Sequence, residues 1–258
     1  MDLNLRGKLA LITGASKGIG LACARQFAEE GCRLHLASRT EADLERAKES
    51  IQARHNVSVT NHPVDLSNGE AVRELASACS DIDILVNNAG AIPAGDLQAI
   101  DESLWRQAWD LKVFGYINMC REIYPVMKAR GRGVIVNVLG AAGERPTPGY
   151  IAGSTGNAAL MAFTRSMGSN SLADGIRIVG CNPGLIRTER LEAILRARAQ
   201  EKLGDPARWE ELVPKNPPVG TPEQCADLIV FLTSDRASHI TGTIITIDGG
   251  AVYREGAL

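Results

Sequence analysis

The stretch Leu9-Ala10-Leu11-Ile12-Thr13-Gly14-Ala15-Ser16-Lys17-Gly18-Ile19-Gly20 decides the fold of this chain. Its apolar run of strand length passes directly into a glycine-rich turn, and the apolar residues from 21 to 31 recur with helical period. The three glycines let the backbone turn from strand to helix and approach a pyrophosphate, which lies at the positive end of the helix. The stretch therefore predicts a strand–turn–helix unit that binds a dinucleotide.

Short apolar runs alternate with longer helical segments along the rest of the chain. We expect strands at 9–13, 33–38, 57–64, 84–87, 134–138, 176–182 and 244–247, and helices at 21–31, 41–54, 70–79, 104–130, 154–173 and 226–233. Uninterrupted apolar runs suit parallel strands that helices cover on both faces. The prediction is one α/β domain over residues 1–258, with a Rossmann-type doubly wound sheet of about seven parallel strands.

Composition limits the classes of partner. The 258 residues are 45% hydrophobic, enough for one large core, and the net charge of -2 provides no basic field for nucleic acid or anionic membranes. Six cysteines without a Cys-x-x-Cys pair indicate a reducing compartment and no metal site. The N-terminus does not resemble a signal peptide, and no apolar stretch has membrane-spanning length. We expect a cytoplasmic protein with a small-molecule substrate.

The glycine spacing Gly-x-x-x-Gly-x-Gly resembles that of the short-chain dehydrogenase/reductase family. Further family motifs follow in order over almost the whole chain: Val64-Asp65-Leu66, Asn87-Asn88-Ala89-Gly90, Pro183-Gly184 and Asp248-Gly249-Gly250. The resemblance implies a nicotinamide cofactor, with Asp65 at the adenine and Thr188 at the carboxamide. The cofactor-binding residues expected are Gly14, Ser16, Lys17, Gly18, Ile19, Gly20, Arg39, Asp65, Leu66, Asn88, Ala89, Gly90, Pro183, Gly184, Ile186 and Thr188.

The residues after the second strand bear on the choice of nicotinamide. Ala37-Ser38-Arg39-Thr40 has no carboxylate for the ribose hydroxyls of NAD, whereas Arg39 and Lys17 supply two cations for the extra phosphate of NADP. The alternative is that both are solvated surface charges. We expect NADP(H) to be preferred, with NAD(H) also accepted.

The family's catalytic residues are an Asn, a Ser and a Tyr-x-x-x-Lys pair. An ungapped register puts Lys112 at the Asn position, Gly140 at the Ser position, Gly153 at the Tyr position and Asn157 at the Lys position. We therefore expect a divergent member without the usual set, in which Lys and Asn have exchanged places. Tyr150 lies about one helical turn before Gly153, which would bring its hydroxyl near the vacated space. The expected catalytic residues are Tyr150, Lys112 and Asn157.

Alternatives to these assignments stay open. Another register makes Tyr150 the family tyrosine and Ser154 the family lysine, at the cost of three inserted residues in a packed helix. Tyr150 would otherwise only pack, and Lys112 would only reach solvent or the ribose. Glycines 140, 143, 149, 153 and 156 leave room for a bulky substrate or mark a degraded site.

Three further features carry expectations. Residues 187–222, irregular except for a helix at 191–202, follow the sixth strand and suit a substrate lid, the alternative being a surface excursion. Glu144 and Arg145 either face substrate or form a mutual surface ion pair. His35, His55 and His62 have no spacing partners and are interpreted as structural or exposed, with no metal site expected.

Three functions compete on this scaffold. The first is an NADP(H)-dependent oxidoreductase that exchanges hydride with a carbonyl, alcohol or imine-type small molecule and uses an atypical proton donor. The second is a non-redox enzyme of lyase or isomerase type in which Lys112 is a desolvated base or nucleophile. The third is a catalytically silent NADP-binding sensor. The resemblance also implies a homotetramer or dimer, paired through the long central helices and the tail at 253–258.

Overall fold

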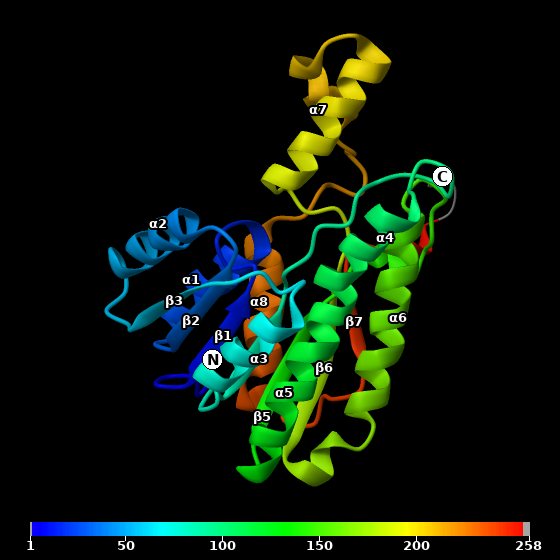
Figure 1. Cartoon of the computed structure of the whole chain (residues 1–258). Coiled ribbons are helices and arrows are strands. Elements are labelled where there is room, and N and C mark those ends of the chain that lie inside the picture. Colours follow the sequence, from blue (N-terminus) through cyan, green and yellow to red (C-terminus); the bar gives the residue numbers. More distant parts are fainter. Residues whose placement is uncertain (1, 255–258) are drawn as a thin grey trace.

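The computed structural model describes residues 2–254 and contains one sheet of seven parallel strands (Figure 1). The strand order is β3-β2-β1-β4-β5-β6-β7. The strands are β1 (Leu9–Thr13), β2 (Arg33–Ser38), β3 (Val59–Pro63), β4 (Ile84–Asn87), β5 (Gly133–Val138), β6 (Ile176–Pro183) and β7 (Ile244–Ile247). The predicted fold class, a single α/β domain with about seven parallel strands, is confirmed.

The helices form a layer on each face of the sheet. They are α1 (Gly18–Glu29), α2 (Glu41–Gln52), α3 (Gly69–Ala78), α4 (Glu102–Trp109), α5 (Gly115–Ala129), α6 (Ile151–Gly168), α7 (Glu189–Leu203) and α8 (Pro222–Thr233). One apolar core lies between the strands and α1, α2 and α8, and a second lies beneath α3 and α5. Every residue of β1 and β6 is buried, as expected for strands covered on both faces.

The segment expected to be one helix over 104–130 differs from the prediction. It contains α4, a π-helical turn at Asp110–Phe114, and α5. Single π turns inside helices often occur at functional sites, and this one carries Lys112 on its buried side. Periodicity misses the turn because one extra residue leaves the apolar pattern on either side intact.

The segment that follows β6 projects from the layered body (Figure 1). It contains α7 and a run of 3-10 turns at Pro206–Leu212, and it rejoins the body at α8. The helix predicted at 191–202 is therefore present, within slightly wider bounds. Among residues 2–254, no helix combines the length and apolar character needed to cross a membrane.

Candidate active site

The glycine turn between β1 and α1 has the conformation that its sequence requires. Gly14 and Gly18 have left-handed φ values of 64° and 56°. A Cβ atom on Gly20 would overlap the carbonyl oxygen of Gly14. Lys17, the N-cap of α1, makes no side-chain hydrogen bond to the first turn, so the amides at this helix start face outward without a cap. The turn is a cradle for an anionic group.

Asn88 and Ala89 hold this turn from the end of β4. The Asn88 Nδ2 donates to the carbonyl oxygens of Thr13 at 3.0 Å and of Gly14 at 3.2 Å. The Thr13 hydroxyl accepts from the amides of Asn88 at 2.9 Å and Ala89 at 3.1 Å. These two predicted cofactor-binding residues therefore fix the shape of the glycine turn.

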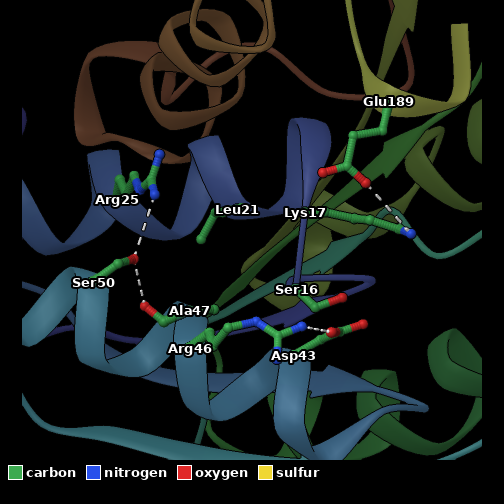
Figure 2. Close-up of a pocket in the computed structure, with 9 residues that line it drawn as sticks. All are labelled: Ser16, Lys17, Leu21, Arg25, Asp43, Arg46, Ala47, Ser50 and Glu189. Atoms are coloured by element: carbon green, nitrogen blue, oxygen red, sulfur yellow. Dashed lines mark hydrogen bonds and ion pairs between the residues drawn. The ribbon is translucent and has the colours of Figure 1, made fainter. Parts of the chain in front are cut away.

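A pocket of about 350 Å³ lies beside the turn, between α1 and α2 (Figure 2). Lys17 lines it and lies 3.8 Å from the carboxylate of Glu189, the first residue of α7, and both side chains are largely exposed. Arg46 pairs with Asp43 on the α2 wall. The lining residues are Ser16, Lys17, Leu21, Arg25, Asp43, Arg46, Ala47, Ser50 and Glu189.

The other residues predicted to bind the adenosine part of the cofactor lie after the ends of β2 and β3. Arg39 directly follows β2 and is exposed. The Asp65 carboxylate accepts from the Ser67 amide at 3.0 Å and from the Ser67 hydroxyl at 2.8 Å, which fixes the loop after β3. Leu66 is buried. The side chains of Arg39 and Asp65 thus both lie at the carboxyl edge of the sheet.

The residues predicted to bind the nicotinamide part of the cofactor lie at 183–188, from the end of β6 to the N-cap of α7. Gly184 donates from its amide to the carbonyl oxygen of Ile247, and a Cβ there would press on Asp248. The Thr188 hydroxyl accepts from the Leu191 amide at 3.3 Å and thereby caps α7. The Thr188 methyl group lies 3.4 Å from the Cβ position of Gly18, so the start of α7 lies directly over the glycine turn.

Lys112 is buried, with 8% of its surface exposed. Its Nζ donates to the carbonyl oxygen of Val138 at 2.6 Å and to the hydroxyl of Tyr116 at 2.9 Å, and that hydroxyl also donates to Val138. Burial, and secondly the charge of Arg190, lower the pKa of Lys112 to about 7. Lys112 is therefore an amine that exchanges its proton near neutral pH.

Tyr150 occupies the N-cap position of α6, and its ring lies against Gly153. A Cβ atom on Gly153 would overlap the Cε1 and Cζ atoms of that ring. Among residues 2–254, the Tyr150 hydroxyl has no hydrogen-bond partner, and the side chain is half-buried against the apolar cluster of Ile92 and Ala152. The phenol therefore lies where a side chain at residue 153 would extend.

Asn157 lies one turn further along α6. Its Nδ2 donates to the Gly153 carbonyl oxygen at 2.9 Å, while its Oδ1 is buried and has no partner among the described residues. The side-chain amide lies 3.0 Å from the Cβ position of Gly140, the second residue after β5. Asn157 thus carries an unused acceptor at the end of the central strand.

The structure brings together some of the predicted catalytic residues. Tyr150 and Asn157 both contact Gly153, whereas the hydrogen bonds of Lys112 go to Tyr116 and Val138 instead. Tyr116 was missed by the sequence reasoning. Its spacing of four residues from Lys112 is the signal that would have found it, because such residues share one helical face.

Glu144 and Arg145 do not pair with each other among the described residues, so the expected mutual ion pair is wrong. Glu144 accepts from Asn182 at 3.0 Å, from Thr246 at 2.8 Å and from the Tyr253 hydroxyl. Arg145 donates to the carbonyl oxygen of Ala251 at 2.9 Å. Both side chains tie the loop after β5 to the carboxyl-terminal segment, a long-range contact that residue spacing does not reveal.

His35 and His62, interpreted as structural or exposed, are half-buried and contact each other, a contact that their spacing in the sequence does not reveal. Their rings stack with centroids 4.8 Å apart, beside the thiol of Cys79. The two histidines are 27 residues apart in sequence, and only the pairing of β2 with β3 brings them together.

Comparison with known proteins identifies the family. A family model described as Enoyl-(Acyl carrier protein) reductase matches residues 14–252. Dehydrogenase/reductase SDR family member 4 of Oryctolagus cuniculus is 32% identical over 256 residues, which covers 97% of this chain and 95% of the relative. The chain belongs to the short-chain dehydrogenase/reductase family.

A dehydrogenase and a reductase are similarly related. Galactitol 2-dehydrogenase (L-tagatose-forming) of Cereibacter sphaeroides is 32% identical over 248 residues, 95% of each chain. The structure of L-sorbose reductase from Gluconobacter frateurii, complexed with NADPH and L-sorbose, superposes with a TM-score of 0.91 at 30% identity, covering 98% of this chain and all of that one. These relatives support an oxidoreductase and the predicted Rossmann-type fold.

The residues present fit the nicotinamide cofactor of a short-chain dehydrogenase/reductase. The glycine cradle at the start of α1 has neither side chains nor a cap that would exclude a pyrophosphate. The orphaned Asn157 Oδ1 is an acceptor without an internal donor, as expected where a hydroxyl-bearing ligand completes the site.

Proposed function

We propose that this protein is an NADP(H)-dependent oxidoreductase that exchanges hydride with a small carbonyl, alcohol or imine-type molecule and takes its proton from Tyr150. The observation that carries the proposal is the position of the Tyr150 ring. At the position where the family resemblance expects a tyrosine, the chain has Gly153, and the phenol of Tyr150 extends into that space.

The preference for NADP(H) rests on charge at the adenosine end. Arg39 follows β2, and Lys17 lines the pocket beside the glycine turn. A guanidinium meets phosphate oxygens through a planar fork, and an ammonium adds a second positive charge. Because residues 37–40 supply no carboxylate for ribose hydroxyls, these cations favour the phosphorylated cofactor, while NAD(H) remains a weaker ligand.

The mechanism assigns one task to each side chain. When bound, a nicotinamide would supply the hydride chemistry at the substrate carbon. In reduction, the Tyr150 hydroxyl donates a proton to the substrate oxygen or nitrogen, and in oxidation it receives that proton. Asn157 accepts a hydrogen bond at its free Oδ1 and orients the bound ligand.

Lys112 is buried on the π turn before α5, where its side chain lies against Gly90. Because its pKa is lowered to about 7, the Lys112 amine can bind and release a proton near neutral pH. A pKa near the working pH is what general acid–base catalysis requires. Lys112 and Tyr116 therefore form the proposed proton store, and Tyr150 the proposed donor.

The segment 187–222 is proposed as the substrate lid. Arg190 of α7 donates to the carbonyl oxygen of Gly90 at 3.2 Å and to that of Ile92, which fastens the start of α7 over the end of β4.

The expected pairing of central helices in a homo-oligomer is supported by Phe114, which is 49% exposed between α4 and α5. The predicted contact through the tail at 253–258 lies largely outside the described residues.

A deuterium-labelled cofactor tests hydride transfer directly. NADPH deuterated at the transferred position is incubated with the protein and pooled ketones, aldehydes, enones and cyclic imines, and mass spectrometry records deuterium in the products. Incorporation supports the oxidoreductase and identifies the substrate class. Saturable NADPH binding without incorporation would contradict redox turnover and favour a silent cofactor sensor.

A second candidate function rests on the lowered pKa of Lys112, since a neutral amine is a nucleophile. In that non-redox reaction, Lys112 would condense with a substrate carbonyl, releasing water and forming an imine. Borohydride would trap the adduct as a secondary amine, detected by mass. Trapping in the wild type and its loss in Lys112→Ala would support this candidate.

A further inference from the structure

Two histidines from adjacent strands face the same side of the sheet. In the parallel pairing of β2 with β3, His35 lies opposite Thr60 and His62 lies opposite Ala37. Side chains alternate along a strand, so residues 35 and 37 share a face, as do residues 60 and 62. His35 and His62 are therefore diagonal neighbours on one face, with their rings 22° from parallel.

A cysteine from the helix above completes the group. Cys79 is the C-cap of α3 and is fully buried in the core beneath α3 and α5. Its Sγ lies 3.5 Å from His35 Nδ1 and 3.7 Å from His62 Nε2. The two ring nitrogens are 2.5 Å apart. Three donor atoms from three elements thus converge within 4.8 Å of one another.

We propose that His35, His62 and Cys79 form a binding site for a divalent transition-metal ion of the zinc class, separate from the cofactor site. Imidazole nitrogen and thiolate sulfur are the ligands that zinc prefers. The metal would bond to His35 Nδ1, His62 Nε2 and Cys79 Sγ. Water would fill the fourth position.

The separations match tetrahedral coordination at sulfur. Zinc–nitrogen bonds of about 2.05 Å and a zinc–sulfur bond of about 2.3 Å place nitrogen and sulfur about 3.6 Å apart at the tetrahedral angle. The two sulfur–nitrogen distances here are 3.5 and 3.7 Å. The two nitrogens would separate from 2.5 Å to about 3.3 Å, a movement that small ring rotations provide.

The protonation states also suit a metal. Burial lowers the pKa of both histidines, and the charge of Arg33 lowers that of His35 further while Asp81 opposes it. A neutral imidazole keeps one nitrogen lone pair for coordination. Burial, reinforced by Asp81, raises the pKa of Cys79 to about 12, so the metal-free side chain is a thiol. Binding converts this thiol to a thiolate and releases one proton to solvent.

Such a metal would tie together the adenosine-binding half of the sheet. β2 leads directly to Arg39, β3 leads to the loop of Asp65, and α3 packs in one apolar core with Ala37 of β2. All three ligands lie in or directly after these elements, below the carboxyl edge. The bound ion would therefore stabilise the elements that present the adenosine-side residues, without touching the proposed proton donor.

The test uses the untagged full-length protein after treatment with a chelator. Titration with Co²⁺ alone should produce a thiolate-to-cobalt charge-transfer band that saturates at one ion per chain, and Zn²⁺ should remove it. Zn²⁺ should also raise the melting temperature. Cys79→Ser should lose the band, and His62→Gln should weaken binding at least tenfold, about the loss seen when a metal site is disturbed.

His55→Gln and Cys32→Ser are the matched controls, because each removes a histidine or a buried cysteine outside the cluster. Both should bind Co²⁺ like the wild type. Circular dichroism of each metal-free variant separates lost ligands from lost folding, and His62→Gln serves if Cys79→Ser does not fold. Absence of the band in the wild type, or an unchanged Co²⁺ affinity in His62→Gln, would overturn the site whatever the enzyme's activity.

Discussion

The aromatic ring of Tyr150 occupies the volume into which any side chain at residue 153 would extend. The first residue precedes α6, and the second lies in its first turn, so the absence of a side chain at 153 and the position of the phenol depend on each other. The phenol therefore enters this space from the residue that precedes the helix.

We predict that Gly153→Ala displaces the Tyr150 ring. Inserting a methyl group into occupied space costs about 1–3 kcal/mol, and thermal unfolding measures the loss. Turnover should fall as well, because the proposed donor moves. Gly149→Ala is the control, since a Cβ there meets nothing within 4 Å. Equal stability of the two variants would show that the ring moves freely.

Tyr150→Phe tests the proton donor itself. The substitution keeps the ring and removes the hydroxyl, so turnover should fall about 10²–10⁴-fold, the usual contribution of a positioned acid. The affinity for NADPH, followed by cofactor fluorescence, should stay unchanged because Tyr150 does not line the glycine turn. Retained turnover would remove Tyr150 from the mechanism.

Lys112 should give a recognisable pH dependence of stability. The unfolded lysine keeps its proton up to its ordinary pKa of 10.5, whereas the folded one loses it at about 7. Between these values the unfolded state binds more protons, so this residue makes stability rise with pH. Below about pH 7 the full cost of the buried charge is present.

Lys112→Met should therefore be stabilised most, relative to wild type, at about pH 6, and the difference should shrink toward pH 10. Denaturant unfolding at several pH values gives the curve, and the exposed Lys202→Met is the control. A difference independent of pH would show that Lys112 keeps its proton throughout, contrary to its burial.

The sequence predicted the fold because the fold depends on local patterns. Uninterrupted apolar runs identified buried parallel strands, and the glycine turn located the dinucleotide end. Both signals lie within a few consecutive residues. The π turn at 110–114 was missed because it adds a residue without changing the apolar face.

The contacts of the site were predictable only between residues that are close together in the sequence. Tyr150 and Gly153 are three residues apart on one helix start, so their proximity follows from helical geometry. The pairing of His35 with His62, the capture of Glu144 by Tyr253, and the bond from Arg190 to Gly90 each join distant segments. Such contacts depend on strand order and loop packing, which spacing does not encode.

Arg190→Gln tests the coupling between the proposed lid and Lys112. The charge of Arg190 is the second cause that lowers the pKa of Lys112, so its removal should raise that pKa. If Lys112 supplies protons in reduction, the fall of kcat with rising pH should move to higher pH. The loss of the bonds to Gly90 and Ile92 should also raise KM. An unshifted pH profile would contradict the coupling.

Arg39→Asp tests the cofactor preference. A guanidinium that bonds to phosphate contributes about 1.5–3 kcal/mol, so its removal should weaken NADPH binding roughly 10–100-fold. NADH binding should stay equal or improve, because the new carboxylate accepts from ribose hydroxyls. Arg73→Asp makes the same charge change on the exposed face of α3 and serves as the control. Isothermal titration calorimetry measures the affinity of each variant for both cofactors. An equal loss of affinity for NADPH and NADH would show that Arg39 does not distinguish between them.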